Sequence, residues 1–144
     1  MRDEYVNAFR RVIQQTRKET GIELPLPVET YVVMLLASKM SDTRFIPEQS
    51  FLQTHLEIHD SRSAKELGDN CLFLTGVFPT YGARFNVDRT YYVSIGASSY
   101  GRAAQTLNYQ VFELLSVHFD YVRAFVEASA SIRSGSDQKT LPKW

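Results

Sequence analysis

The chain has 144 residues, 44% of them hydrophobic and 22% charged, and its sixteen basic residues balance sixteen acidic ones. This composition is typical of one globular domain, and a chain without net charge has no overall attraction to nucleic acid or to an anionic membrane. One cysteine excludes an intrachain disulfide. The charged N-terminal residues are unlike a signal peptide, and no apolar run reaches the ~20 residues of a membrane span. We therefore expect a cytoplasmic protein.

The first sixty residues contain three predicted helices. Residues 3–20 repeat apolar side chains at helical spacing with arginine and lysine on the other side, and Gly21 marks the end of this helix. The segment 22–28, IELPLPV, is expected to be extended, because each proline disfavours helical geometry in the residue before it. Residues 31–40 are apolar on nearly every side, which is typical of a buried helix. A third helix, opened by a proline, is predicted over residues 47–60.

The next predicted helix covers residues 61–78, with Ser61 or Ser63 as its N-cap. Two glycines lie inside it, Gly68 and Gly76, and each costs about 1 kcal/mol relative to alanine in a helix. A buried helix that carries this cost twice predicts that the backbone of a neighbouring helix approaches closely.

Two structures compete for residues 88–105. The sequence TYYVSI alternates and is rich in strand-forming residues, so propensity alone favours a hairpin over residues 83–95. However, Asp88 is a good N-cap, and aromatic and small side chains recur at helical spacing, as from Tyr92 to Gly96. We therefore predict a helix.

The last element is predicted as one continuous helix over residues 107–133. Its apolar residues keep a four-three spacing through more than three heptads, and a second apolar row doubles the width of the face, so we expect it to pack on two neighbours. Residues 134–144 lack periodicity and are expected to form a flexible tail. The predicted fold is an all-α bundle of five or six helices in one domain, residues 1–133; the alternative is an α+β fold with the hairpin at residues 83–95.

Two segments carry a paired motif. Residues 68–78, GDNCLFLTGVF, have the pattern G-D-x-x-L-F-x-x-G-x-F, and residues 88–101, DRTYYVSIGASSYG, have the pattern D-x-x-Y-Y-x-x-x-G-x-x-x-Y-G. With these motifs the chain resembles a group of uncharacterised bacterial proteins. The resemblance implies a mostly helical fold and supports the helix over residues 88–105, and it carries over no activity and no catalytic residue.

Asp69 is the most informative candidate site residue. A carboxylate two positions before a buried run must be paired, because an isolated buried charge is costly. We expect its partner to be Arg102 or the hydroxyl of Tyr91, Tyr92 or Tyr100. Such a network either fixes the register of the helices or lines an apolar pocket, and we favour register because no nucleophile or base lies among these residues. The candidate ligand-binding residues of the pocket alternative are Asp69, Phe73, Phe78, Tyr92, Tyr100 and Arg102.

The histidines and the cysteine are weaker candidates. His55 and His59 have the four-residue spacing by which two imidazoles reach one metal ion, but nothing in the sequence indicates a third ligand, so we predict no metal and no cofactor. His118 lies at a seam position of the last helix, where we expect it to be hydrogen-bonded in the core or to close the edge of the seam. Cys71 lies among apolar residues, which raise the pKa of a thiol and make it unreactive.

Three hypotheses for function follow. The leading one is a non-enzymatic protein-interaction or scaffold domain, expected to be a homodimer, because the last helix is broad, the loop at Tyr81 and Phe85 is aromatic, and no catalytic set is present. The alternative is a binder of an apolar small molecule in a pocket between the central helices. The third is a metal-assisted enzyme that uses His55 and His59. Nucleic acid and membranes are not expected as partners.

Overall fold

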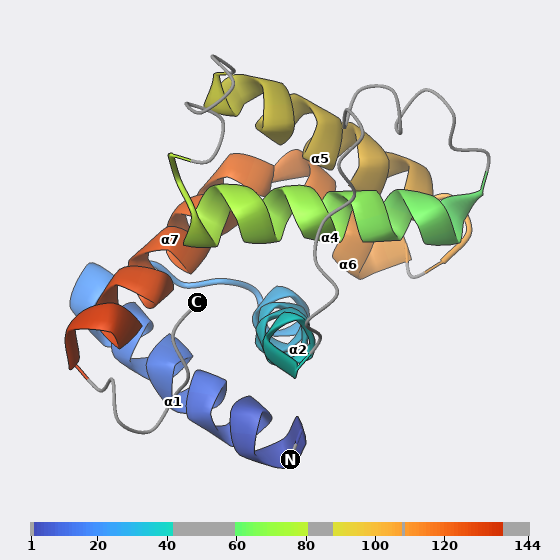
Figure 1. Cartoon of the computed structure of the whole chain (residues 1–144). Helices are drawn as coiled ribbons and strands as arrows, with labels where there is room; N and C mark the ends of the chain where they lie inside the picture. Colours follow the sequence, from blue (N-terminus) through green and yellow to red (C-terminus); the bar gives the residue numbers. More distant parts are fainter. Residues whose placement is uncertain (1, 42–59, 81–87, 108, 137–144) are drawn as a thin grey trace.

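The computed structural model describes residues 2–41, 60–80, 88–107 and 109–136, and every regular element in these ranges is an α-helix, which confirms the all-α prediction for them. The helices, labelled as in Figure 1, are α1 (Arg2–Thr20), α2 (Leu26–Ser41), α4 (Ser61–Val77), α5 (Arg89–Ala103), α6 (Tyr109–Val117) and α7 (Phe119–Ser136). Three predicted segments lie largely outside the described residues: the helix over residues 47–60, of which only Asp60 is described, the aromatic loop, and the tail from residue 137 onward. Residues 134–136, predicted as the start of the tail, belong instead to α7. None of the helices in the described ranges has the length and apolar character needed to cross a membrane.

The first helix agrees with its prediction to within one residue. The second begins at Leu26, five residues before the predicted start, so residues 26–28 are helical and the prediction of an extended segment is correct only for residues 22–25. A proline is tolerated in the first turn of a helix, where its missing N–H costs no intrahelical bond, so Pro27 does not delay the start of α2.

Gly21 has a φ of 73°, and its N–H donates to the Arg17 carbonyl at 3.0 Å, a left-handed termination that a glycine adopts without strain. The chain is then extended until the Pro25 carbonyl accepts the N–H groups of Val28 and Glu29, both at 2.9 Å, which starts α2. As the sequence indicates, α2 is buried on most sides, although Met34 is 38% exposed.

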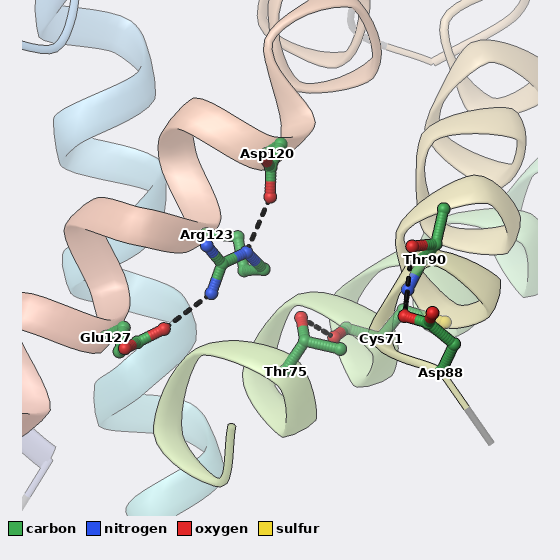
Figure 2. Close-up of polar contacts among 7 residues, drawn as sticks. All are labelled: Cys71, Thr75, Asp88, Thr90, Asp120, Arg123 and Glu127. Carbon is green, nitrogen blue, oxygen red and sulfur yellow. Dashed lines mark hydrogen bonds and ion pairs between the residues drawn. The ribbon is translucent and has the colours of Figure 1, made fainter. Parts of the chain in front are cut away.

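The paired motif forms two capped helices. Asp60 caps α4, because its carboxylate accepts the Ser63 N–H at 2.7 Å; the predicted caps at Ser61 and Ser63 are therefore wrong by one and three positions. Asp88 caps α5 as predicted, with its carboxylate at 3.0 Å from the Thr90 nitrogen (Figure 2). The hairpin alternative is excluded for residues 88–95, which belong to the cap and first turns of α5; residues 83–87 lie outside the described ranges.

α4 occupies the centre of the bundle. It packs most extensively on α5, and α7 packs on another of its sides, while α1 contacts α2 and α7. In Figure 1 α2 is seen end-on and α4 lies in the plane of the view, so these two helices cross.

The glycines of α4 and α5 lie at helix interfaces, and side chains rather than backbones fill the space next to them. A Cβ on Gly68 would lie 2.8 Å from the ring of Tyr100, and one on Gly96 would lie 2.4 Å from the ring of Phe119. At Gly76 the nearest atom, 2.5 Å away, belongs to Val126. The predicted close packing is present, but its form differs, because large side chains of a neighbouring helix lie over each glycine.

The prediction of one continuous helix over residues 107–133 is wrong. The chain turns at His118, which separates α6 from α7, although the His118 and Val122 N–H groups still bond to carbonyls four residues earlier, each at 3.0 Å. No proline or glycine lies at this break. A residue on each side of the break contacts α5: the Ser116 hydroxyl donates to the Ala97 carbonyl at 2.7 Å, and the Phe119 ring packs against Gly96. The bend therefore follows the surface of α5.

Candidate functional site

Asp69 on α4 connects three helices through a buried carboxylate. The residue is 5% exposed. Its Oδ1 accepts hydrogen bonds from the hydroxyls of Tyr31 on α2 and Tyr100 on α5, each at 2.7 Å, and its Oδ2 accepts one from Lys65 Nζ at 2.7 Å. The expected pairing with a tyrosine of α5 is confirmed. Sequence reasoning missed Lys65, which the four-residue spacing on one helix could have indicated, and Tyr31, for which no local signal exists.

The glycine before Asp69 explains how Tyr100 reaches the carboxylate. The Tyr100 ring lies against Gly68, where a Cβ would approach its carbons to 2.8 Å. Phe112 stacks on the same ring at a centroid distance of 6.0 Å, and the Tyr31 ring meets it edge-on at 6.4 Å. Any side chain at position 68 would displace the ring and its hydroxyl. The Gly-Asp pair of the first motif and the last tyrosine of the other motif, Tyr100, thus form one packing unit.

The chemistry of this cluster is that of a structural network. Burial, and then the charge of Asp69, raise the pKa of Tyr31 and of Tyr100, so both phenols remain protonated and donate hydrogen bonds at neutral pH. Lys65 supplies the opposite charge and lies 5.7 Å from the centroid of the Tyr31 ring. Both oxygens of the carboxylate accept hydrogen bonds, and these bonds join α2, α4 and α5.

The cation bonded to Asp69 is Lys65, whereas Arg102 was the cation expected there. Tyr100 and Arg102 are two residues apart, which is about 200° around a helix, so the two side chains leave α5 on opposite sides. Lys65, one turn before Asp69 on the same helix, is the cation at the carboxylate.

The remaining candidate residues for a ligand are aromatic. The rings of Phe73 and Phe78 meet edge-on at a centroid distance of 6.0 Å, and Tyr92 is buried with its ring 5.0 Å from that of Tyr91. Among the predicted ligand-binding residues, the structure thus brings Asp69 to Tyr100 and Phe73 to Phe78.

An open cavity of about 330 Å³ lies elsewhere, between the segment before α2 and the break between α6 and α7. We call it the apolar groove; its lining residues are Leu24, Pro25, Val28, Leu114, His118, Tyr121 and Val122. One wall is formed by the end of the extended segment and the first turn of α2, and the other by residues of α6 and α7 on both sides of the bend at His118.

The apolar groove is lined mainly by one of the two apolar rows of the last two helices, with Val122 added from the other row. The row with Leu115, Phe119 and Val122 is buried in the core. The row with Leu114, His118 and Tyr121 lies at its edge, and Tyr121 is 48% exposed. His118 is exposed at the groove rather than hydrogen-bonded in the core, so of its two predicted positions only the one at the edge of the seam agrees with the structure.

Next to this row, the solvent-facing side of α6 and α7 carries acidic residues. Glu113, Val117 and Asp120 are spaced four and three residues apart, all three are exposed, and Val117 is 70% exposed. Asp120 is bonded to the guanidinium of Arg123 at 2.7 Å, and Glu127 holds the same guanidinium at 2.6 Å (Figure 2). Although burial of Arg123 acts in the opposite sense, its bonds to these two carboxylates raise its pKa, so it stays charged.

Possible metal ligands do not gather among the described residues. No group of three or more histidine, cysteine, aspartate or glutamate side chains in these ranges is placed to hold a metal ion. His55 and His59 lie outside them. Cys71 is buried, and burial raises the pKa of its thiol.

Comparison with known protein families, with curated proteins and with solved structures finds no match to this chain.

Proposed function

We propose that the chain is a non-enzymatic protein-interaction domain and that the apolar groove docks a helix of a partner protein. The observation that carries this proposal is the groove itself: seven residues from two distant segments, five of them aliphatic or proline, enclose about 330 Å³ that the chain leaves unfilled. A cavity of about 150 Å³ is enough to hold one benzene ring, so this volume suits about two large apolar side chains.

A helix is the occupant that matches the walls of the groove. Leu114, His118 and Tyr121 recur at the four-three spacing of a helix surface that packs on another helix. Recognition of an amphipathic helix by an apolar groove uses the same spacing in the partner. The alternative mode, addition of a strand to a sheet edge, has no counterpart in the described ranges, which contain helices only.

A second copy of this chain suits the groove less well. In a symmetrical dimer through this face the same surface faces itself, so the groove of one copy would meet the groove of the other and not a protruding helix. We therefore propose a partner of different sequence, in place of the expected homodimer through this face.

The test is selection from a displayed library of helical peptides of about 16 residues, long enough for a helix to persist. We expect enrichment of sequences with two large apolar residues one helical turn apart. The enriched peptide should lose binding to Tyr121→Glu, which places a charge in the groove, and keep binding to Met34→Glu, a matched change at a position of similar exposure outside it.

Two results contradict the proposal. One is the absence of any enriched apolar pair. The other is an enriched peptide that binds wild type and Tyr121→Glu with equal affinity, since its site then lies elsewhere.

A second candidate, the binder of an apolar small molecule, is supported by the size of the same cavity, which lies within the roughly 300–1,000 Å³ of ligand sites. The His118 imidazole and the Tyr121 hydroxyl would orient such a ligand. Native mass spectrometry of freshly purified protein tests it: a co-purifying mass that Tyr121→Glu lacks supports the small molecule, and the apoprotein alone, with no thermal shift across a lipid and aromatic library, excludes it.

A further inference from the structure

The regulation of the apolar groove can be specified further, on the basis of the function proposed above. We propose that protonation of His118 controls docking: the neutral imidazole admits an apolar side chain of the partner helix, and the charged imidazolium excludes it.

His118 differs from the other residues of the groove in its acid–base chemistry. Among the seven described residues that line the groove, it is the one whose side-chain type changes charge between pH 5 and pH 8. Five of the others are aliphatic or proline, and the sixth, Tyr121, carries a phenol, a group that keeps its proton throughout this range. A proton gained by His118 therefore places a charge in a wall that is otherwise apolar or phenolic.

The facing wall of the groove, residues 24–28, contributes no charged side chain to the lining in the part of the chain that the structure describes. The carboxylates nearest to it in the sequence are Glu23 and Glu29. Neither lines the groove, and Glu29 lies 3.1 Å from the guanidinium of Arg17.

The wall that carries His118 has three charged neighbours, Glu113 on α6 and Asp120 and Arg123 at the start of α7. None of the three lines the groove. Asp120 is bonded to Arg123 at 2.7 Å, and Glu113 has an interaction partner of its own. Within the described lining, an imidazolium at His118 thus finds no carboxylate with which to pair.

Docking makes the charge of an imidazolium costly. His118 is exposed, and an apolar side chain that enters the groove displaces water from its ring, which disfavours the charged form of a histidine. A neutral histidine presents an apolar body and a polar tip, so its ring can be covered while the tip stays in water. The docked form therefore binds fewer protons than the free form. By linkage, the affinity of the groove falls as the pH falls through the range in which histidine gains its proton.

The experiment measures the binding of one probe peptide to the full chain at two pH values. The probe is an alanine-based helix of about 16 residues with two leucines one turn apart, glutamines for solubility and both ends blocked, so that it has no titratable group. By isothermal titration calorimetry we expect the dissociation constant to be about tenfold larger at about pH 5.5 than at about pH 7.5. Circular dichroism at both pH values verifies that each protein used remains folded.

Substitutions at the three histidines of the chain locate the effect. His118→Gln is neutral at both pH values, so its dissociation constant for the probe should change by less than about twofold between them. The matched control, His55→Gln combined with His59→Gln, removes the other two histidines and should retain the change of about tenfold.

The outcomes separate the control by His118 from the docking of a helix. Binding that is independent of pH and lost in Tyr121→Glu overturns the control by His118 and leaves the interaction domain standing. A pH dependence that His118→Gln retains, or that the double variant at His55 and His59 loses, also overturns it, since the titrating group then lies elsewhere. If the probe binds wild type at neither pH, the control by His118 and the docking of a helix are both contradicted.

Discussion

Replacing Asp69 should reveal how much the buried cluster contributes to stability. Asp69→Ala removes the acceptor of two phenols and of one ammonium group. Asp69→Asn keeps an Oδ1 acceptor at the same place for both phenols and replaces Oδ2 with an amide, which faces Lys65. Because Lys65 is partly exposed, its ammonium group can turn to water in this variant.

The two changes differ in magnitude. A buried donor left without an acceptor costs about 1–3 kcal/mol. Asp69→Ala leaves two such donors, the hydroxyl of the fully buried Tyr100 and that of the half-buried Tyr31, so we expect the free energy of unfolding to fall by about 3–4 kcal/mol in total. Asp69→Asn loses one charge-assisted bond that is partly exposed, or about 1 kcal/mol. For a chain of this length 1 kcal/mol corresponds to about 3 °C in Tm, so we expect decreases of about 10 °C and about 3 °C.

The assay is thermal unfolding followed by circular dichroism at pH 7. Glu66→Ala, which removes an exposed carboxylate from the same helix, is the control and should change the free energy of unfolding by less than about 0.5 kcal/mol. If both Asp69 variants melt like wild type, the carboxylate is not a buried structural partner. If the asparagine variant melts as low as the alanine variant, the shared acceptor oxygen is not what holds the tyrosines.

Three further predictions follow from the packing and the ionisation of buried groups. Gly96→Ala should lower Tm by about 3–9 °C, because the added Cβ would lie 2.4 Å from the buried ring of Phe119. Gly101→Ala, whose Cβ meets only a serine hydroxyl at 3.2 Å, should leave Tm unchanged or slightly higher. Equal Tm values for the two variants would contradict the packing. The pKa values of Tyr31 and Tyr100 are raised in the fold, so these phenols ionise first in the unfolded chain, and the free energy of unfolding should fall as pH rises above about 10. Urea unfolding should show that Tyr100→Phe reduces the slope of this fall by about 1.4 kcal/mol per pH unit. An unchanged slope would show that the Tyr100 phenol ionises freely in the fold. Cys71, whose thiol pKa is raised by burial, should react with a thiol reagent only at the rate of unfolding, and immediate labelling of the native protein would refute its burial.

Much of the helical structure was predictable because it depends on nearby residues. Asp88 favours α5 over a hairpin by capping it, and Gly21 terminates α1, since both effects involve atoms within one turn. The need of Asp69 for a partner was predictable as well, because it follows from burial of the flanking residues. The identity of one partner was not, since Tyr31 lies 38 residues earlier.

The candidate site was less predictable than the fold. The extended, proline-containing segment and the second apolar row of the last helix were both visible in the sequence, but neither indicated the other. The break at His118 has no local cause such as proline or glycine. Residues on either side of it contact α5, and His118 at the break lines the apolar groove.

By itself, the sequence determined the helical class, most helix ends in the described ranges, and the burial of an acid between glycine-bearing helices. The tertiary structure decided which of the two rows, the one with Phe119 or the one with Tyr121, faces the core, and hence where the surface is hollow. The physical reason is that caps and helical periodicity are short-range properties. The choice between two similar faces depends instead on the shape of helices that come from distant parts of the chain.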